Sequence, residues 1–252
     1  MKTEEKIQII VQKLKDYLGN RVAVIGVSGG IDSAVVAGLC SQAIGPDKIL
    51  AVMMPNHKQR AEDGLLVCKT FGIKMWHIIG IEKFIEAYKS WFSKNELSDK
   101  LVLGNIQARI RMSILYANSN INDGMVIGTG NKSEMAVGYF TKYGDGGVDV
   151  EPIGDIYKTE VFEMAKILGV PEKIINKPPS AELWDNQTDE DEIGMTYDDL
   201  DRILKYIYNP GFSSDDEFIA VQMFGADKVN RVQTLIAQSE HKRNLPPVFE
   251  IE

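Results

Sequence analysis

The segment that begins at Val22, VAVIGVSGGIDSAVV, has residue types and spacing suited to binding a phosphate group. Its first half is rich in valine and isoleucine, which predicts a buried parallel strand. A turn of glycine and serine follows, and then an apolar run at helical spacing. This order directs backbone N–H groups and a helix start towards an anion. Ser28, Gly29, Gly30 and Ser33 offer small side chains and free backbone donors in this turn.

The charge in this loop has the opposite sign to that of an ATPase loop. The ATPase form, G-x-x-x-x-G-K-[ST], has a lysine that reaches the β- and γ-phosphates, whereas this loop has Asp32 and no lysine. An aspartate alone would repel phosphate, but a divalent cation reverses that effect, so Asp32 is predicted to be a Mg²⁺ ligand facing pyrophosphate. Without a lysine on the γ-phosphate, the loop favours release of pyrophosphate, attack at the α-phosphorus and formation of AMP.

The surrounding sequence alternates predicted strands with predicted helices, which indicates an α/β fold with a doubly wound parallel sheet and flanking helices. Ligands of such Rossmann-like, three-layer folds lie outside the carboxyl ends of the strands, where two glycine turns would lie here. We expect strands at 21–27, 48–55, 73–80 and 124–131, and helices at 3–18, 31–43, 61–71 and 158–168. The span 81–120 is predicted to be helical with a break near 95–99.

The second half of the chain is predicted to continue the same domain, which spans residues 1–252. Its glycine- and aspartate-rich segment, 140–158, is expected to form an ordered functional loop. The acidic run 185–192 is expected to be a solvated loop, with a lid as the alternative. Two more helices precede the tail, so a helical extension of about 181–252 would pack on the sheet.

Composition excludes several classes of protein. The formal net charge of −8 over 252 residues argues against binding nucleic acid through bulk charge. No signal peptide and no apolar run of about 18–20 residues is present, so a cytoplasmic protein without a membrane segment is expected. Cys40 and Cys68 lie in apolar surroundings, which predicts buried, reduced thiols. Three scattered histidines cannot build a zinc site, so any metal should be a hard cation bound by oxygen.

Several longer motifs resemble a known family. The loop SGGIDS is similar to the signature of the N-type ATP pyrophosphatases, and the remaining motifs resemble NAD⁺ synthetases in their short, ammonia-dependent form. These motifs are GNIQARIRM, GTGNKSEMAVGYFTKYGDGGVD, PIGDIYKTEV, KPPSAELW and EHKR. They run from the first predicted strand to the tail, and FTKYGDGG is far more specific than SGGIDS.

The resemblance implies an AMP-forming amide ligase. ATP would adenylate the nicotinate carboxylate of deamido-NAD⁺ and release pyrophosphate, and ammonia would then attack the acyl-adenylate to give NAD⁺ and AMP, the last step of NAD⁺ biosynthesis. Such chemistry needs positioning and charge stabilisation rather than a covalent nucleophile. The resemblance also implies a homodimer whose interface shapes the dinucleotide site.

The family roles, carried over by position, assign Mg²⁺ to Asp32 and Glu134, and catalysis to these two residues with Lys158. Contacts with the ATP phosphates fall on Gly26, Val27, Ser28, Gly29, Gly30, Ile31, Asp32 and Ser33. Further ATP contacts fall on Thr129, Lys158 and Ser180, where serine replaces the threonine of the family. Deamido-NAD⁺ contacts fall on Arg109, Lys142, Asp149, His241 and Lys242. Arg109 and Arg111 are two apart on a helix and point to different faces, so Arg111 is expected to be a structural ion-pair partner instead.

The nitrogen donor is expected to be free ammonia. Releasing ammonia from glutamine takes an activated cysteine, and neither Cys40 nor Cys68 has a histidine nearby in sequence. Asp149 is the candidate for taking a proton from ammonium. The alternatives are another N-type ATP pyrophosphatase, such as the ATPase subunit of GMP synthetase or a tRNA-modifying thiolase, and a nucleotide-binding regulator without turnover. The absence of a catalytic cysteine pair and the acidic charge count against the thiolase.

Overall fold

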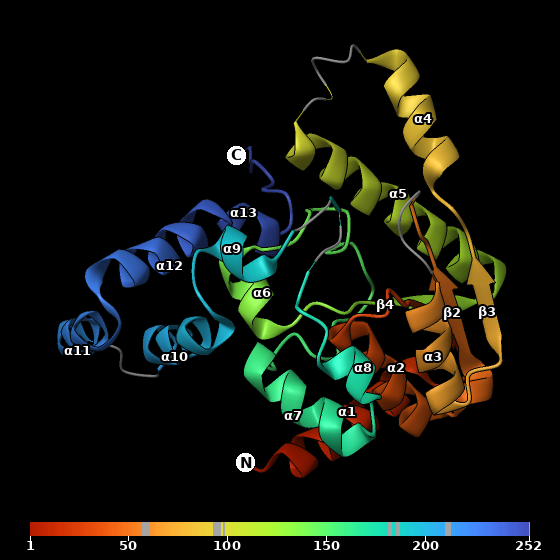
Figure 1. The fold of residues 1–252 in the computed structure, drawn as a ribbon, viewed down its shortest axis with the longest axis horizontal. Helices are drawn as coiled ribbons and strands as arrows, with labels where there is room; N and C mark the ends of the chain where they lie inside the picture. The colour runs from red at the N-terminus through yellow and green to blue at the C-terminus, as the bar shows by residue number, and fades with distance from the viewer. Residues whose placement is uncertain are drawn as a thin grey trace.

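Four parallel strands form the centre of the fold in the computed structural model (Figure 1), which describes residues 1–56, 61–92, 97, 99–180, 183–184, 187–209 and 213–251. They are β1 (Val22–Gly26), β2 (Ile49–Met53), β3 (Met75–Ile78) and β4 (Gly124–Ile127). The strand order is β3-β2-β1-β4. Ile25 of β1 is paired with Ala51 of β2 on one side and with Ile127 of β4 on the other.

Helices cover both faces of this sheet, as the sequence predicts for a doubly wound fold. One face carries α1 (Thr3–Leu18), α2 (Ile31–Ile44), α3 (Glu62–Phe71), α7 (Lys158–Leu168) and α8 (Glu172–Ile175), and the other carries α4 (Glu82–Trp91) and α5 (Lys100–Ile121). Side chains alternate along a strand, so Ala23 and Ile25 of β1 belong to the first core while Val24 belongs to the second. Both cysteines are buried in the first core, as predicted.

A third core joins the C-terminal helices to the sheet domain. It includes residues of α6 (Lys132–Val137), α9 (Asp189–Ile193), α10 (Tyr197–Ile207) and α12 (Ala226–Gln238). Two further helices, α11 (Ser214–Phe224) and α13 (Glu240–Arg243), complete this region, which lies beside α6 and α7 in Figure 1. The expectation of two helices here was too low: α10, α11 and α12 are three helices of 11 to 13 residues, and the short helices α9 and α13 carry too few residues for a clear periodic pattern.

The acidic run also differs from its predicted form. Residues 189–192 belong to the helix α9 rather than to a loop, and Asp189 is only 4% exposed, whereas Asp191 and Glu192 are solvent-exposed as expected. Thr188 caps α9, and the four acidic residues that follow lie in its first turn, where the helix dipole favours negative charge. Residues 185 and 186 of the run lie outside the described residues.

The long helical span 81–120 is divided into α4 and α5, and part of the predicted break, 95–96 and 98, lies outside the described residues. Asp99 caps α5 by accepting a hydrogen bond from the backbone N–H of Leu101 at 2.7 Å. In the described part of the chain, no helix combines the length and apolar character that crossing a bilayer requires.

Candidate active site

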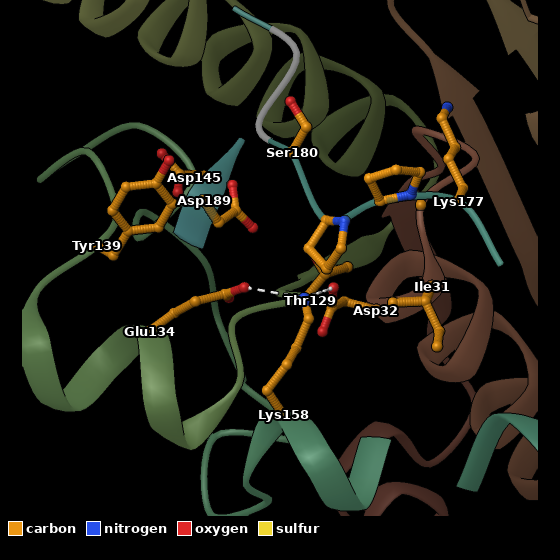
Figure 2. Close-up of a pocket in the computed structure, with 13 residues that line it drawn as sticks. Ile31, Asp32, Thr129, Glu134, Tyr139, Asp145, Lys158, Lys177, Ser180 and Asp189 are labelled. Carbon is orange, nitrogen blue, oxygen red and sulfur yellow. Dashed lines mark hydrogen bonds and ion pairs between the residues drawn. The ribbon is translucent and has the colours of Figure 1, made fainter. Parts of the chain in front are cut away.

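The crevice at the carboxyl ends of β1 and β4 is where this sheet offers a ligand site. The chain continues from β1 to β2 on one side, whereas β4 joins β1 on the other, so the strand order reverses between β1 and β4. The phosphate-loop candidate follows β1, and Thr129 follows β4. A cavity of about 150 Å³ opens there, lined by Asp32, Thr129, Glu134, Lys158 and Ser180 among others (Figure 2).

The loop after β1 is shaped by glycine. Gly29 has φ of +86°, and a Cβ added to it would lie 2.5 Å from the Cβ of Asp63, so both conformation and space require glycine. The backbone N–H of Gly30 donates to Ser28 Oγ at 3.1 Å, and Ser33 Oγ donates to the carbonyl of Gly30 at 3.0 Å. Gly30 is the N-cap of α2 and has no capping side chain, which leaves the first N–H groups of this helix for an anion.

Lys158 joins the two predicted metal ligands. Its Nζ lies 2.5 Å from Asp32 Oδ2 and 3.2 Å from Glu134 Oε1 (Figure 2), and the residue is only 1% exposed. Burial lowers the pKa of Lys158, but the two carboxylates outweigh it and hold the pKa above its ordinary value. Lys158 therefore stays an ammonium at the crevice, where it can neutralise charge on phosphate.

Asn131 fixes the two carboxylates relative to each other. Its side-chain oxygen accepts from the backbone N–H of Glu134 at 3.1 Å and begins α6, while its Nδ2 donates to Asp32 Oδ1 at 3.0 Å. Asn131, at the end of the glycine turn after β4, thus contacts both the helix that carries Glu134 and the loop that carries Asp32. Sequence reasoning left the contacts of Asn131 open.

Tyr197 and Asp189, which the sequence analysis did not select, complete the cluster. Tyr197 Oη lies 3.0 Å from Asp189 Oδ2 and 3.3 Å from Glu134 Oε1, so its one O–H can donate to either carboxylate. Its ring centroid is 5.0 Å from Lys158 Nζ. Burial, together with the negative charges of Asp32 and Asp189, raises the pKa of Glu134 to about 7. The positive charge of Lys158 opposes this shift but does not cancel it. The cluster therefore carries surplus negative charge that a cation would relieve.

The donor set fits Mg²⁺ only in part. Asp32 and Glu134 offer carboxylate oxygens at the cavity, the ligand type that Mg²⁺ prefers. Over the described residues, no group of three histidine, cysteine or acidic side chains is placed to hold a metal by itself. Mg²⁺ is commonly held by one or two carboxylates plus substrate phosphates and water, so these residues fit an ion that arrives with ATP.

A second buried carboxylate anchors the start of α7. Asp201 of α10 is 1% exposed, accepts from the backbone N–H of Thr159 at 2.8 Å, and accepts from the hydroxyl of Ser133. Ser133 Oγ in turn accepts from the backbone N–H of Lys158 at 2.9 Å. Asp201 thus links the C-terminal helices to Lys158 at the start of α7.

A larger, mostly apolar cavity of about 560 Å³ adjoins the first. Gly26, Val27, Ser28, Thr129 and Ser180 line it, so the predicted ATP contacts border the same continuous space. Its walls include Met54, Ala108, Met112, Leu115, Phe140 and Val148, which suit a flat aromatic or heterocyclic ring.

Arg111 lies on the side of α5 that faces the larger cavity. It lines this larger cavity and donates from Nε to the carbonyl of Met54 at 3.1 Å, so it does not point away from the site. Arg109 lines none of the three described cavities and instead donates to the carbonyl of Lys142 at 3.3 Å. The two-residue spacing places the arginines on different faces, but the cavity lies on the face of Arg111.

The other predicted dinucleotide contacts fall into two groups. Lys142 donates from Nζ to the carbonyl of His241, and neither residue lines a described cavity. Lys242 borders two cavities and donates to the carbonyls of Gly138 and Phe140, both at 2.7 Å. Asp149 borders a third cavity of about 320 Å³.

Comparison with known proteins identifies the family. The family model described as NAD synthase matches residues 3–246. The chain belongs to the NAD synthase family, and it is an enzyme of that family. An NH₃-dependent NAD⁺ synthetase from Archaeoglobus fulgidus is 43% identical over 254 residues, covering 99% of this chain and 97% of the relative.

Two solved structures show how closely the fold is shared within the NAD synthase family. An NMN synthetase from Francisella tularensis superimposes with a TM-score of 0.85 at 34% identity, covering 100% of both chains. An NH₃-dependent NAD synthetase from Campylobacter jejuni, in complex with nitrate, superimposes with a TM-score of 0.81 at 28% identity, covering 99% of this chain and 100% of the other.

Proposed function

We propose that this NAD synthase family member converts deamido-NAD⁺ to NAD⁺ with ATP and ammonia, releasing AMP and pyrophosphate. The proposal rests on one observation: Lys158 forms ion pairs with Asp32 and Glu134 beside a phosphate loop that lacks a lysine. The relatives' names supply the product, NAD⁺, and the donor, NH₃.

Activation of the carboxylate is the first chemical step. A carboxylate is a poor electrophile, and oxide is a poor leaving group, so the carboxylate must be activated before ammonia can attack it. One carboxylate oxygen attacks the α-phosphorus of ATP and forms an acyl-adenylate. The P–O bond to pyrophosphate breaks, and its electrons leave with that group. The N–H groups at the start of α2 and the ammonium of Lys158 stabilise the developing charge.

Mg²⁺ would be held by Asp32 and Glu134 together with phosphate oxygens, and it would neutralise negative charge on the pyrophosphate group. Lys158 lies between the two carboxylates and would share them with the ion. The pKa of Glu134, raised to about 7, falls when a cation binds, which favours its ionised, metal-binding form.

Ammonia attack on the acyl carbon is the second step, with AMP as the leaving group. Burial raises the pKa of Cys40 to about 12 and that of Cys68 to about 11, so neither thiol suits the nucleophilic role that glutamine hydrolysis requires. Asp149 remains the candidate proton acceptor for ammonium and borders the third cavity. Tyr116 donates to its Oδ1 at 3.0 Å, and the backbone N–H of Val126 donates to its Oδ2 at 2.8 Å.

A homodimer would complete the dinucleotide site. Apolar side chains of β3 and α4 are exposed, including Met75, Phe84, Tyr88 and Trp91, and they border the face that also carries α5. Arg109 of α5 lies outside the described cavities, so a second copy placed against this face would give it a ligand-facing role.

A second candidate substrate is the acid of NMN, nicotinate mononucleotide, with the same two steps. It is favoured by the NMN synthetase likeness, which exceeds that to the Campylobacter enzyme in both TM-score and identity. The two candidate substrates differ in the adenylate half of the dinucleotide, which the mononucleotide lacks.

Product analysis tests the proposal and separates these substrates. The purified protein is incubated with ATP, Mg²⁺ and ammonium, together with either deamido-NAD⁺ or nicotinate mononucleotide. We expect AMP and pyrophosphate in equal amounts and a higher kcat/KM with the dinucleotide. ADP and orthophosphate, or no amide product, would contradict the reaction; a higher kcat/KM with the mononucleotide would select the second candidate.

A further inference from the structure

The charges around the first cavity show a shortage of positive groups for a triphosphate. Among its described lining residues, the acidic side chains are Asp32, Glu134, Asp145 and Asp189, and the basic ones are Lys158 and Lys177. Lys158 already contacts two carboxylates, so its charge is largely shared with them. Lys177 is therefore the remaining basic residue of the described lining for phosphate oxygens that the divalent ion does not reach.

Lys177 lies at the edge of the phosphate loop. Its Nζ lies 3.4 Å from Oδ2 of Asp63, the residue whose Cβ excludes any side chain at Gly29. The stem of Lys177 lines the cavity, and its amino group is turned away from the Asp32–Lys158 pair in Figure 2. The side chain is 31% exposed, which leaves it room to reorient.

Asp63 does not depend on Lys177 for its counter-charge. Lys173 contacts Asp63 Oδ1 at 2.6 Å, closer than the 3.4 Å contact of Lys177. Hydrogen bonding from Lys173 is the largest cause that holds the pKa of Asp63 below its ordinary value. Withdrawal of Lys177 therefore leaves a paired carboxylate rather than a bare one, which lowers the cost of moving this lysine.

We propose that Lys177 leaves Asp63 when ATP binds and donates to the outer phosphates, thereafter holding the pyrophosphate product. Lys177, in the KPPS segment across the cavity, would thus take the role of the lysine that the glycine loop lacks. Pro178 and Pro179, which also line the cavity, restrict the backbone that carries it. This inference rests on the proposed cleavage of ATP to AMP and pyrophosphate.

The test compares two lysines that share one partner. Lys177→Gln removes the charge at the cavity, and Lys173→Gln removes a charge from the same Asp63 at a residue that is not among the cavity's described lining. Calorimetry measures equilibrium binding of pyrophosphate with Mg²⁺ to each variant, and thermal melting checks folding. We expect Lys177→Gln to weaken pyrophosphate binding by about tenfold or more, the effect of losing one charged hydrogen bond.

Lys173→Gln should weaken pyrophosphate binding less than Lys177→Gln does, because it keeps the lysine at the cavity but leaves Asp63 with Lys177 as its remaining described counter-charge. Lys177→Arg should restore most of the loss, because it keeps the charge. Equal binding by wild type and Lys177→Gln, or equal weakening by both glutamine variants, would overturn the assignment. Failure of the wild type to form AMP and pyrophosphate would instead overturn the proposed function, because the binding measurement does not depend on turnover.

Discussion

Glu151 provides a quantitative test of the electrostatics next to the site. Its Oε2 accepts from the backbone N–H of Gly130 at 3.0 Å, and its carboxylate occupies the space that a side chain at Gly128 would need. Burial, together with the charges of Asp145 and Glu134, raises the pKa of Glu151 to about 8, although the hydrogen bond from Gly130 opposes the shift. A carboxyl group with a raised pKa binds its proton more tightly when folded.

The perturbation is Glu151→Gln, which keeps the size and the acceptor but removes the titration. Between the unfolded pKa of about 4.5 and the folded pKa of about 8, the unfolded state ionises first, so wild-type stability falls as pH rises through this window. The full shift corresponds to about 5 kcal/mol at about 1.4 kcal/mol per unit. Because Glu151 is only half-buried, solvent screens part of the effect and we expect about 2–3 kcal/mol.

The assay is urea unfolding of wild type and Glu151→Gln at pH 5 and pH 8.5. The variant should gain about 2–3 kcal/mol relative to wild type between these two pH values. Glu163→Gln on α7 removes a surface carboxylate and serves as the control for net charge. A stability difference between Glu151→Gln and wild type that is the same at both pH values would refute the reasoning.

Four further substitutions test the site itself. Asp32→Asn or Glu134→Gln should each lower turnover by at least about 100-fold with a higher Mg²⁺ requirement, as expected for electrostatic stabilisation of the transition state; near-normal turnover at ordinary Mg²⁺ would exclude the metal assignment. Gly29→Ala should abolish calorimetric ATP binding, because the loop cannot keep its positive φ and its space is filled; undiminished ATP binding would show that the loop shape does not matter. Asp201→Asn should lower the free energy of unfolding by roughly 1–3 kcal/mol and reduce kcat more than it raises KM, since the lysine that begins α7 loses its anchor. Asp198→Asn on the same helix, where the side chain is 72% exposed, is its control, and a stability loss with unchanged kcat would make Asp201 merely structural.

The phosphate loop and the sheet were predictable because their signals are local. A valine-rich strand, a glycine turn and a helix start follow each other within one segment, and parallel strands place their carboxyl ends at one edge. This was enough to bring Asp32 and the turn at Thr129 to one crevice. The family resemblance placed Lys158 in the same site as Asp32 and Glu134, but its contacts with both carboxylates were not predicted, since its own segment reads only as a helix start.

The residues missed by sequence reasoning depend on tertiary packing. Tyr197 and Asp201 lie four apart on α10, a spacing that reads as a core-facing stripe, yet one contacts Glu134 and the other anchors α7. Asp189 belongs to an acidic run that is typical of a solvated surface, and only the third core turns it inwards. The orientation of Arg111 likewise follows from how α5 packs on the sheet, which spacing alone does not fix.

Oxygen tracing tests the central claim, attack of the substrate carboxylate on the α-phosphorus, most directly. Deamido-NAD⁺ labelled with ¹⁸O in its nicotinate carboxylate is turned over with ATP, Mg²⁺ and ammonium, and the products are analysed by mass spectrometry. The acyl-adenylate route predicts one labelled oxygen in AMP and none in pyrophosphate, since the attacking oxygen leaves with the α-phosphoryl group. AMP without label, or label in any other phosphate product, would contradict the account.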